Sequence, residues 1–355
     1  LLERVKNSDL VHVFTGASIK SLDGFIGNYK TVVEAGGQEH AFEHGAVIIA
    51  TGAYENDTDE YLRGKHDAVV TQRELEQFIH DGNPKAMDAR SVVMIQCVGS
   101  RCEERPYCSR YCCSEAIKNA LKLKEADPDK DITILYRDIR TYGLKEDYYK
   151  KAREANVKFI RYEEDLKPEV TADGDGLRIS LFDYILNEKV ELHADLLTLS
   201  VGVVPNPDNE KIGQLLKVST NQDNFFLEAH VKLRPVDFAT DGVFVCGMAH
   251  SPKMSDESVT QASAAVSRAL TILTKDYIEA EGKTAYVNKE RCMGCGLCEL
   301  NCPFGAIEVN KVERYAEVNS VLCKGCGVCT ASCRMNAVDL YGFNNEEILA
   351  QIGAL

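Results

Sequence analysis

The stretch SVVMIQCVGSRCEERPYCSRYCCSEAIKNALKLKEA, residues 91–126, reads as a strand, a cysteine-rich loop and a helix. Residues 91–97 are mostly apolar and contain valine and isoleucine, which favours a buried strand. Further strands of this kind are expected at 45–54, 132–138, 194–206 and 242–253, and helices at 71–79, 113–126, 144–156 and 258–274. Alternation of strands with helices predicts a doubly wound α/β fold with parallel sheets.

The composition limits the classes of function. The chain has 355 residues, 45% of them hydrophobic, which suits two or three packed domains. A net charge of −14 argues against nucleic-acid binding, which requires a basic face. The sequence has no apolar run of membrane-spanning length and no signal-peptide pattern, so we expect no direct membrane insertion. Fourteen cysteines in close groups favour metal ligation in a reducing cytoplasm.

The C-terminal cysteines form two copies of the spacing C-x2-C-x2-C-x3-C, the pattern of bacterial ferredoxins with two clusters. In that arrangement each cluster takes three cysteines from one copy and the last cysteine of the other. We therefore assign one [4Fe–4S] cluster to Cys292, Cys295, Cys298 and Cys333, and the second to Cys302, Cys323, Cys326 and Cys329. Structural zinc is the alternative, but it needs four ligands rather than eight in a doubled pattern.

The end of the chain divides into a ferredoxin domain at 284–342 and a terminal helix at 343–355. In this helix Ile348, Leu349, Ile352 and Leu355 recur at helical spacing. We expect the helix to cover the ferredoxin core, with docking on a partner as the alternative.

Two apolar strands end in motifs that resemble those of flavoproteins with two dinucleotide-binding domains, such as thioredoxin reductase. The first strand ends in Ala50, Thr51 and Gly52, and the second, V-F-x-x-G, ends at Gly247 ahead of the helix at 258–274. In that family both motifs border FAD, and a helix N-terminus can hold an anion through its free N–H groups. Two features depart from the family. Met248 stands where an aspartate is usual, and the sequence has no G-x-G-x-x-G. We expect a fragment of a longer chain, with a separate subunit for the missing unit as the alternative.

This resemblance divides the rest of the chain. Residues 1–85 are expected to form the first part of a FAD-binding domain, and residues 207–283 its return segment. Residues 86–206 resemble a degenerate NAD(P)-binding domain in which the cysteine loop replaces the usual glycines. The expected class is α/β, a two-dinucleotide-binding-domain core of the thioredoxin-reductase type, followed by an α+β ferredoxin domain with two [4Fe–4S] clusters.

The cysteine loop itself has three interpretations. One is a [4Fe–4S] cluster held by Cys97, Cys108, Cys112 and Cys113 at the positive end of a helix, although adjacent cysteines can share it only if the helix start is distorted. Another is a redox-active dithiol, for which a vicinal disulfide would be strained. The last is a set of inert buried thiols. We take Cys102 as a non-ligand, with its replacement of Cys97 or Cys108 as the rival assignment.

Over essentially its whole length the sequence closely resembles the A subunit of heterodisulfide reductase, a flavin and iron–sulfur protein. The resemblance is carried by A-T-G-A-Y, Q-C-V-G-S-R with P-Y-C-S-R-Y-C-C, I-L-Y-R-D-I-R-T-Y-G, G-M-A-H-S-P-K, the doubled ferredoxin pattern and G-F-x-x-E-x-I-L-A-Q-I. It implies a third [4Fe–4S] cluster in the cysteine loop, and FAD with Lys253 as a candidate flavin contact. The FAD-binding candidates are Ala50, Thr51, Gly52, Gly247, Met248, Ser251, Pro252 and Lys253.

The resemblance also implies a function: FAD- and iron–sulfur-dependent electron transfer, with flavin-based bifurcation between a disulfide-reducing partner and ferredoxin. The implied partners are other heterodisulfide-reductase-type subunits, an electron donor of the hydrogenase or formate dehydrogenase type, and ferredoxin, around a homodimer in a larger complex. Two alternatives remain. The chain could be a non-catalytic wiring and docking subunit, or part of the quinone-linked oxidoreductase of sulfate reducers.

A few further residues are weighed singly. We expect Cys246 to be a core residue of its strand. His250 either contacts the flavin or caps a turn. Arg137, Asp138 and Arg140 are expected to form a surface ion-pair set, with a role beside the cysteine loop as the alternative.

Overall fold

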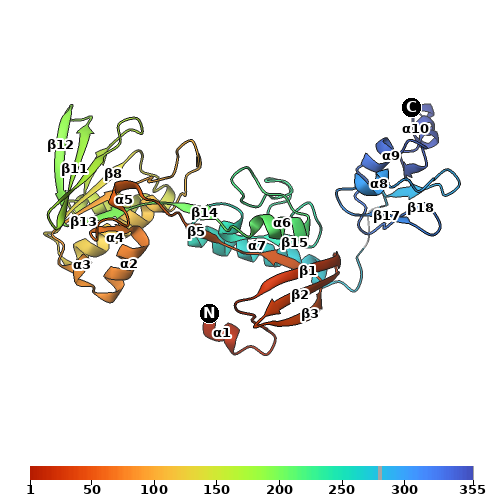
Figure 1. Ribbon diagram of the computed structural model, residues 1–355, viewed down its shortest axis with the longest axis horizontal. Helices are drawn as coiled ribbons and strands as arrows, with labels where there is room; N and C mark the ends of the chain where they lie inside the picture. The colour runs from red at the N-terminus through yellow and green to blue at the C-terminus, as the bar shows by residue number, and fades with distance from the viewer. Residues whose placement is uncertain (279–281, 355) are drawn as a thin grey trace.

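The computed structural model describes residues 1–278 and 282–354 and shows an elongated molecule of three bodies (Figure 1). The sheet body comprises residues 56–202, the central body residues 1–55 and 203–278, and the C-terminal body residues 282–354. The expected segments 207–283 and 343–355 therefore include residues outside the described part, among them Leu355. No described helix is both long and apolar enough to cross a bilayer.

A five-stranded parallel sheet lies at the centre of the sheet body, in the order β6-β13-β7-β8-β9. Its strands are β6 (Val69–Thr71), β7 (Ser91–Ile95), β8 (Asp131–Tyr136), β9 (Lys158–Arg161) and β13 (Leu196–Leu199). The helices of this body are η1 (Glu60–Leu62), α2 (Gln72–Asp81), α3 (Pro84–Met87), α4 (Cys112–Ala126), η2 (Gly143–Lys145) and α5 (Glu146–Glu154). Apolar side chains of α2, α3, α4 and α5 pack on one face of the sheet.

The other face of this sheet is covered by an antiparallel meander rather than by helices. The meander consists of β10 (Glu169–Asp173), β11 (Gly176–Asp183) and β12 (Glu188–Ala194). Leu177, Ile179 and Leu181 of β11 pack against Val93 and Ile95 of β7. A parallel sheet must be covered on both faces, and here the meander supplies the second cover.

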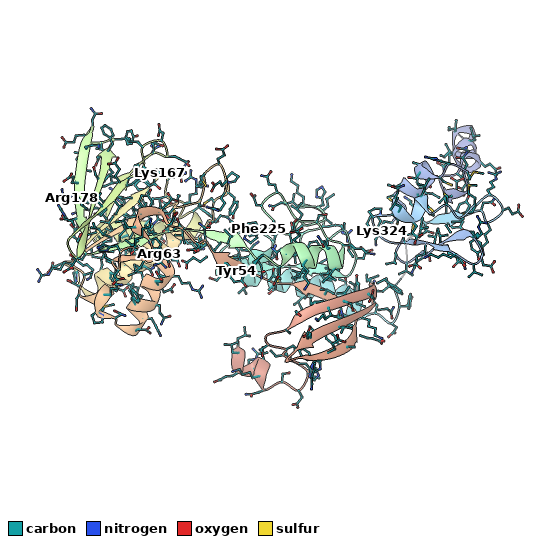
Figure 2. All side chains as sticks on the ribbon, viewed as in Figure 1. Tyr54, Arg63, Lys167, Arg178, Phe225 and Lys324 are labelled. Atoms are coloured by element: carbon teal, nitrogen blue, oxygen red, sulfur yellow. The ribbon has the colours of Figure 1, made fainter. Side chains whose placement is uncertain are left out.

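The central body is joined to the sheet body by the antiparallel pair β5 (Ala53–Glu55) and β14 (Val203–Pro205), where Tyr54 lies (Figures 1 and 2). It contains α1 (Leu2–Lys6), β1 (Ser18–Phe25), β2 (Asn28–Ala35), β3 (Gln38–His44), β4 (Val47–Ile49), α6 (Asn209–Leu216), β15 (Val243–Val245), η3 (Gly247–Ala249) and α7 (Ser255–Leu273). β4 and β15 pair in parallel, and β1, β2 and β3 form an antiparallel meander. Cys246 packs with Ala265 and Ala269 of α7, so its expected place in the core is confirmed.

The described part of the C-terminal body consists of two short antiparallel strand pairs and three helices. Its elements are β16 (Ala285–Val287), α8 (Leu297–Leu300), β17 (Ile307–Asn310), β18 (Tyr315–Val318), α9 (Val328–Ser332), β19 (Val338–Leu340) and α10 (Asn345–Gly353). β16 pairs with β19 and β17 with β18, both antiparallel. The α/β core and the α+β ferredoxin-type end predicted from the sequence are confirmed by this architecture.

The terminal helix differs from its expectation. α10 begins at Asn345 with a complete capping box, but no described residue of the helix is buried. Leu349 and Ile352 are 66% and 62% exposed. The helix therefore does not cover the ferredoxin core, because its apolar side chains face outward instead.

Candidate iron–sulfur and flavin sites

The cysteine loop begins at the carboxyl end of β7 and ends where α4 starts at Cys112. Three residues of the loop that are not glycine adopt positive φ angles: Cys97 (61°), Arg101 (59°) and Arg110 (64°). This conformation is strained for residues with a side chain, and such strain gathers at functional sites. The backbone of the loop is thus held in a shape that packing around it must maintain.

Four cysteines of the loop lie close enough to affect one another. Burial raises the pKa of Cys97, raises that of Cys113 to about 12, and raises that of Cys112 well above its ordinary value. The charges of Cys97 and Cys108 raise the pKa of both Cys112 and Cys113 further. Buried thiols with raised pKa values ionise readily only when a metal replaces the proton, so the chemistry of this donor set suits a thiolate-bound cluster. Cys102 lies in a turn in which its N–H donates to the carbonyl of Arg105.

Arginines surround these sulfurs. Nη1 of Arg101 lies 3.8 Å from Sγ of Cys97 and forms an ion pair with Asp138. Arg140 hydrogen-bonds Asp138, and Asp138 and Cys108 both raise its pKa. Sγ of Cys113 lies 3.8 Å from the backbone oxygen of Asp138. The structure therefore places Asp138 and Arg140 beside the cysteine loop, the alternative left open by the sequence.

The C-terminal cysteines gather around two small cavities. One cavity is lined by Cys292, Cys295, Cys298 and Cys333, and the other by Cys302, Cys323, Cys326 and Cys329. Each cavity thus joins three cysteines of one copy with the last cysteine of the other. Backbone N–H groups point at several of these sulfurs, for example that of Ala316 at Cys292 (3.4 Å) and that of Ala306 at Cys302 (3.2 Å). Such N–H···S contacts orient and tune cluster ligands.

Glycine is required at one position beside each cavity. Gly294 has φ +63°, and a Cβ added there would lie 2.6 Å from the carbonyl oxygen of Arg314. Gly325 has φ +60°, and a Cβ would lie 2.2 Å from the carbonyl oxygen of Lys283. Both positions combine a left-handed backbone with a backbone contact that cannot yield. The two loops are therefore built to close tightly over what the cysteines hold, which fits [4Fe–4S] clusters.

The described side chains do not converge as they would on a single metal ion. In residues 1–278 and 282–354, no three side chains of cysteine, histidine, aspartate or glutamate lie close enough together to bind one metal ion. Four sulfurs around one zinc ion would lie about 3.8 Å apart, because each Zn–S bond is about 2.3 Å long. A four-iron cube spreads its cysteine sulfurs more widely. All fourteen cysteines are free of disulfides.

The second flavin motif opens onto a cavity of about 490 Å³ at the N-terminus of α7. His250, Ser251 and Lys253 line this cavity. Nζ of Lys253 donates to Nδ1 of His250 at 3.0 Å and to Oγ of Ser251 at 3.1 Å. Burial is the main cause that lowers the pKa of Lys253 to about 8, and the positive charge of Arg110 lowers it further. Burial also lowers the pKa of His250. A buried lysine aimed at polar neighbours in a cavity is typical of a binding site.

The other flavin-binding candidates lie nearby but outside this cavity. Gly247 and Met248 belong to η3, and the N–H of Gly247 donates to Gln261 of α7. The hydroxyl of Thr51 donates to Asn209 of α6 at 2.9 Å. Ala50 is exposed, Gly52 has φ +72° with open space where a Cβ would stand, and Pro252 is buried. The residues fit the flavin end of FAD, whereas the described chain has no glycine-rich turn for its pyrophosphate.

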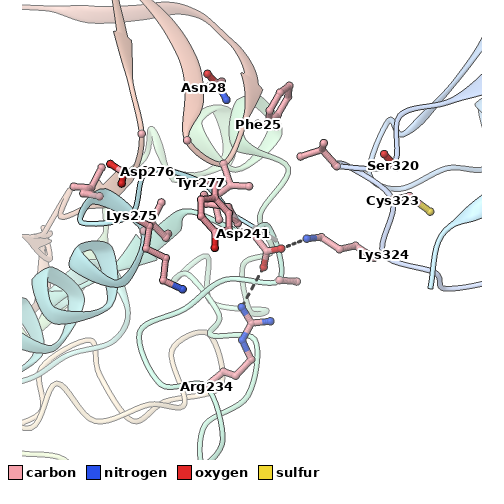
Figure 3. Close-up of a pocket in the computed structure, with 18 residues that line it drawn as sticks. Phe25, Asn28, Arg234, Asp241, Lys275, Asp276, Tyr277, Ser320, Cys323 and Lys324 are labelled. Carbon is pink, nitrogen blue, oxygen red and sulfur yellow. Dashed lines mark hydrogen bonds and ion pairs between the residues drawn. The ribbon is translucent and has the colours of Figure 1, made fainter. Parts of the chain in front are cut away.

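A further cavity, of about 660 Å³, lies between the central and C-terminal bodies (Figure 3). Asp241 of the central body forms ion pairs with Lys324 of the C-terminal body and with Arg234 at 3.3 Å. Lys324 follows Cys323, and it lies on the edge of the C-terminal body that faces the central body (Figure 2). The contact between the two bodies is thus made beside the Cys323 group of cysteines.

The sequence did not single out several residues that the structure places at these sites. Arg101 and Arg110 contact loop cysteines, and Glu257 and Tyr142 contact Arg110. The signal for the arginines was present, because they alternate with the cysteines in the loop. Tyr142 lies within the quoted stretch I-L-Y-R-D-I-R-T-Y-G, but no local pattern gave it or Glu257 a role, because both reach the loop only through the fold.

Comparison with known proteins places these features in a family. A profile of the 4Fe-4S binding domain matches residues 285–308. The chain is 41% identical over 335 residues to the A subunit of H(2):CoB-CoM heterodisulfide,ferredoxin reductase from Methanothermobacter thermautotrophicus, covering 89% of this chain and 50% of that protein. It is also 41% identical over 333 residues to the A subunit of Ferredoxin:CoB-CoM heterodisulfide reductase from Methanosarcina mazei, covering 89% and 41%.

Solved structures show similarity at lower identity. Thioredoxin reductase of T. acidophilum aligns with 73% of this chain and 75% of its own, at 15% identity and a TM-score of 0.47. An NAD-dependent persulfide reductase of A. fulgidus covers 80% of this chain and 49% of its own, at 14% identity and a TM-score of 0.46. The chain spans about half the length of the curated relatives it matches. Over that half, it belongs to the family of the heterodisulfide reductase A subunit.

Proposed function

We propose that this chain is an electron-transfer part of a heterodisulfide-reductase-type oxidoreductase that uses FAD and three [4Fe–4S] clusters. The observation that carries the proposal is the proximity of two sites. The cysteine loop abuts the cavity at the N-terminus of α7, and Arg110 contacts Cys108 of the loop while lining that cavity. A thiolate cluster beside a flavin site suits the passage of single electrons between them.

FAD, when bound, would exchange an electron pair with one partner and single electrons with the clusters. The chain's own residues would bind, orient and neutralise. Lys253 and His250 would hold the flavin end of the cofactor through the polar groups that line the cavity. Cys97, Cys108, Cys112 and Cys113 would hold the loop cluster, and the arginines beside them would offset its negative charge.

We extend the proposal to flavin-based electron bifurcation, with one electron passed toward a disulfide-reducing partner and the other toward ferredoxin. The names of the relatives, which mention H(2), ferredoxin and the CoB-CoM heterodisulfide, support this assignment. The partners would be other subunits of such a complex, a donor of the hydrogenase or formate dehydrogenase type, and ferredoxin, around a homodimer in the cytoplasm.

A non-catalytic wiring and docking subunit is the second candidate. It is favoured by the described residues, which provide cysteine groups for three clusters but no glycine-rich pyrophosphate turn. In that case electrons would enter and leave through clusters alone.

Iron, acid-labile sulfide and flavin counts on the anaerobically purified chain test these proposals. About twelve irons per chain would support three clusters, since each [4Fe–4S] cluster holds four. Cys108→Ser should reduce the count toward about eight, whereas Cys102→Ser should leave it near twelve. A wild-type count of about eight would overturn the loop cluster, and twelve irons without flavin would favour the wiring subunit.

A further inference from the structure

We propose that Arg110 is a positioning residue that fixes the cysteine loop against the flavin cavity and places a positive charge between the two redox sites. This inference rests on the function proposed above. Arg110 lies within the cysteine-rich motif P-Y-C-S-R-Y-C-C, and its role follows from contacts that it makes in two directions.

The backbone of Arg110 contacts the loop cysteines. Its N–H donates to Sγ of Cys108 at 3.2 Å. Arg110 itself holds a left-handed φ of 64°. A hydrogen bond to a ligand sulfur stabilises the more negative, reduced form of a cluster. The backbone of Arg110 therefore belongs to the immediate surroundings of the loop cluster.

The side chain of Arg110 contacts the flavin motif. Nη1 donates to the carbonyl oxygen of Pro252 at 3.2 Å, and Nη2 lies 2.6 Å from Oε1 of Glu257 in the first turn of α7. Nη2 also donates to the hydroxyl of Tyr142. The guanidinium lines the same cavity as Lys253 and depresses the pKa of that lysine. Arg110 thus extends from a ligand sulfur to the wall of the flavin cavity.

A purely mechanical tie between the two bodies would use some of the same contacts. The structure contains such a tie in Lys145, whose Nζ lies 3.0 Å from Asp256 at the start of α7. Lys145 joins the same pair of bodies but has no contact with a cysteine sulfur among its described hydrogen bonds. The two roles therefore predict different results, because a charge beside the cluster shifts its reduction potential, whereas a tie that does not contact the cysteines leaves the potential unchanged.

The experiment compares four variants on the anaerobically purified protein: Arg110→Gln, Arg110→Lys, Glu257→Gln and Lys145→Gln. Iron and sulfide are counted, the midpoint potential of the loop cluster is measured by a redox titration followed by EPR, and hydrogen exchange is followed over residues 97–113 and 247–257. All four variants keep the cysteines, so iron should stay at the wild-type count.

Arg110→Gln should disfavour reduction of the loop cluster about tenfold, which is a fall of ~59 mV for one electron. Glu257→Gln should raise the potential, because Arg110 then keeps its charge without its partner, and Gln still offers an oxygen to the N–H of Met254. Arg110→Lys should keep the midpoint potential of the loop cluster close to the wild-type value, while hydrogen exchange over residues 97–113 and 247–257 becomes faster. Lys145→Gln should make hydrogen exchange over residues 247–257 faster without changing the midpoint potential of the loop cluster.

Equal potentials in wild type and Arg110→Gln at full iron would overturn the inference, as would a shift of Arg110→Gln and Glu257→Gln in the same direction. Failure of the proposed function gives a different result: the wild-type protein itself would hold about eight irons and show no third cluster signal.

Discussion

Lys253, which lines the cavity proposed to hold the flavin, should make the folded protein less stable at neutral pH. The residue is 8% exposed, and burial together with the charge of Arg110 lowers its pKa from 10.5 to about 8. The folded protein therefore holds this proton less tightly than the unfolded chain does. Between about pH 8 and 10.5 the unfolded state binds more protons, so the free energy of unfolding rises with pH across this window.

The size of the effect follows from the two pKa values. The charged lysine would destabilise the folded state by about 3.4 kcal/mol at pH 7 and by about 0.8 kcal/mol at pH 10. The cavity is open to solvent, and screening reduces both values to roughly half. Lys253→Met removes this penalty but also the hydrogen bonds to His250 and Ser251, together worth about 1 kcal/mol. We expect the variant to be more stable than wild type at pH 7 by about 0.7 kcal/mol and less stable at pH 10 by about 0.6 kcal/mol.

Thermal unfolding midpoints at a fixed scan rate, measured from pH 6.5 to 10 for both proteins, test this expectation. Only the difference between wild type and variant is interpreted, because other titrating groups then cancel. The difference should change sign within the window. Lys275→Met, at an exposed lysine beyond α7, is the matched control and should give a flat difference. A difference for Lys253→Met that does not vary with pH would refute the reasoning. Flavin content should fall in Lys253→Met alone.

Three further outcomes are expected. Arg101→Gln removes a charge 3.8 Å from Sγ of Cys97 and should lower the loop-cluster potential in an EPR titration by ~60 mV, about 1.4 kcal/mol after screening; no shift would place the cluster elsewhere. Asp241→Lys should release the C-terminal body from the central body, which X-ray scattering would show as a larger radius of gyration. The double variant Asp241→Lys with Lys324→Asp should return the radius of gyration to the wild-type value. A double variant that keeps the larger radius would contradict the role of the ion pair. The buried ammonium of Lys130 donates to three backbone carbonyl oxygens, and Lys130→Met leaves these oxygens without a donor. The variant should lower the free energy of unfolding by about 2 kcal/mol in a denaturant titration. An unchanged free energy of unfolding would show that water satisfies the carbonyl oxygens.

Much of the fold follows from local patterns. The capping box of Thr71 and Glu74 and the glycine at 82 bound α2 at Gln72–Asp81, close to the expected 71–79. The expected strand at 45–54 is divided, because Gly52 takes φ +72° and turns the chain between β4 and β5. The two antiparallel meanders were not predicted. Their strands alternate apolar with charged residues, but their place on the parallel sheet and beside β4 depends on contacts distant in sequence.

The candidate sites also combine features that the local sequence predicts with features that depend on the fold. The crossed grouping of the C-terminal cysteines follows from spacing alone, and the structure gathers them as expected. Cys112 and Cys113 are adjacent on a regular helix start, and the sequence required a distortion for both to face one site. In the structure α4 begins at Cys112 with no side-chain cap on Tyr111, and Sγ of Cys113 turns toward Asp138. Whether both cysteines ligate one cluster stays a prediction, because it depends on a group that spacing does not position.

The length of α7 separates the proposed redox sites into two groups. Its N-terminus carries the flavin cavity and, through Arg110, the cysteine loop, whereas Ile272 and Leu273 at its C-terminal end line the cavity beside the C-terminal body. Nineteen helical residues span about 28 Å, at 1.5 Å per residue. Under the proposed function, the loop cluster, and not the pair of C-terminal clusters, would be adjacent to the flavin site. On that proposal, electrons that pass between the C-terminal body and the cavity would cross the length of α7 through another carrier, or the C-terminal body would separate from Asp241 and move.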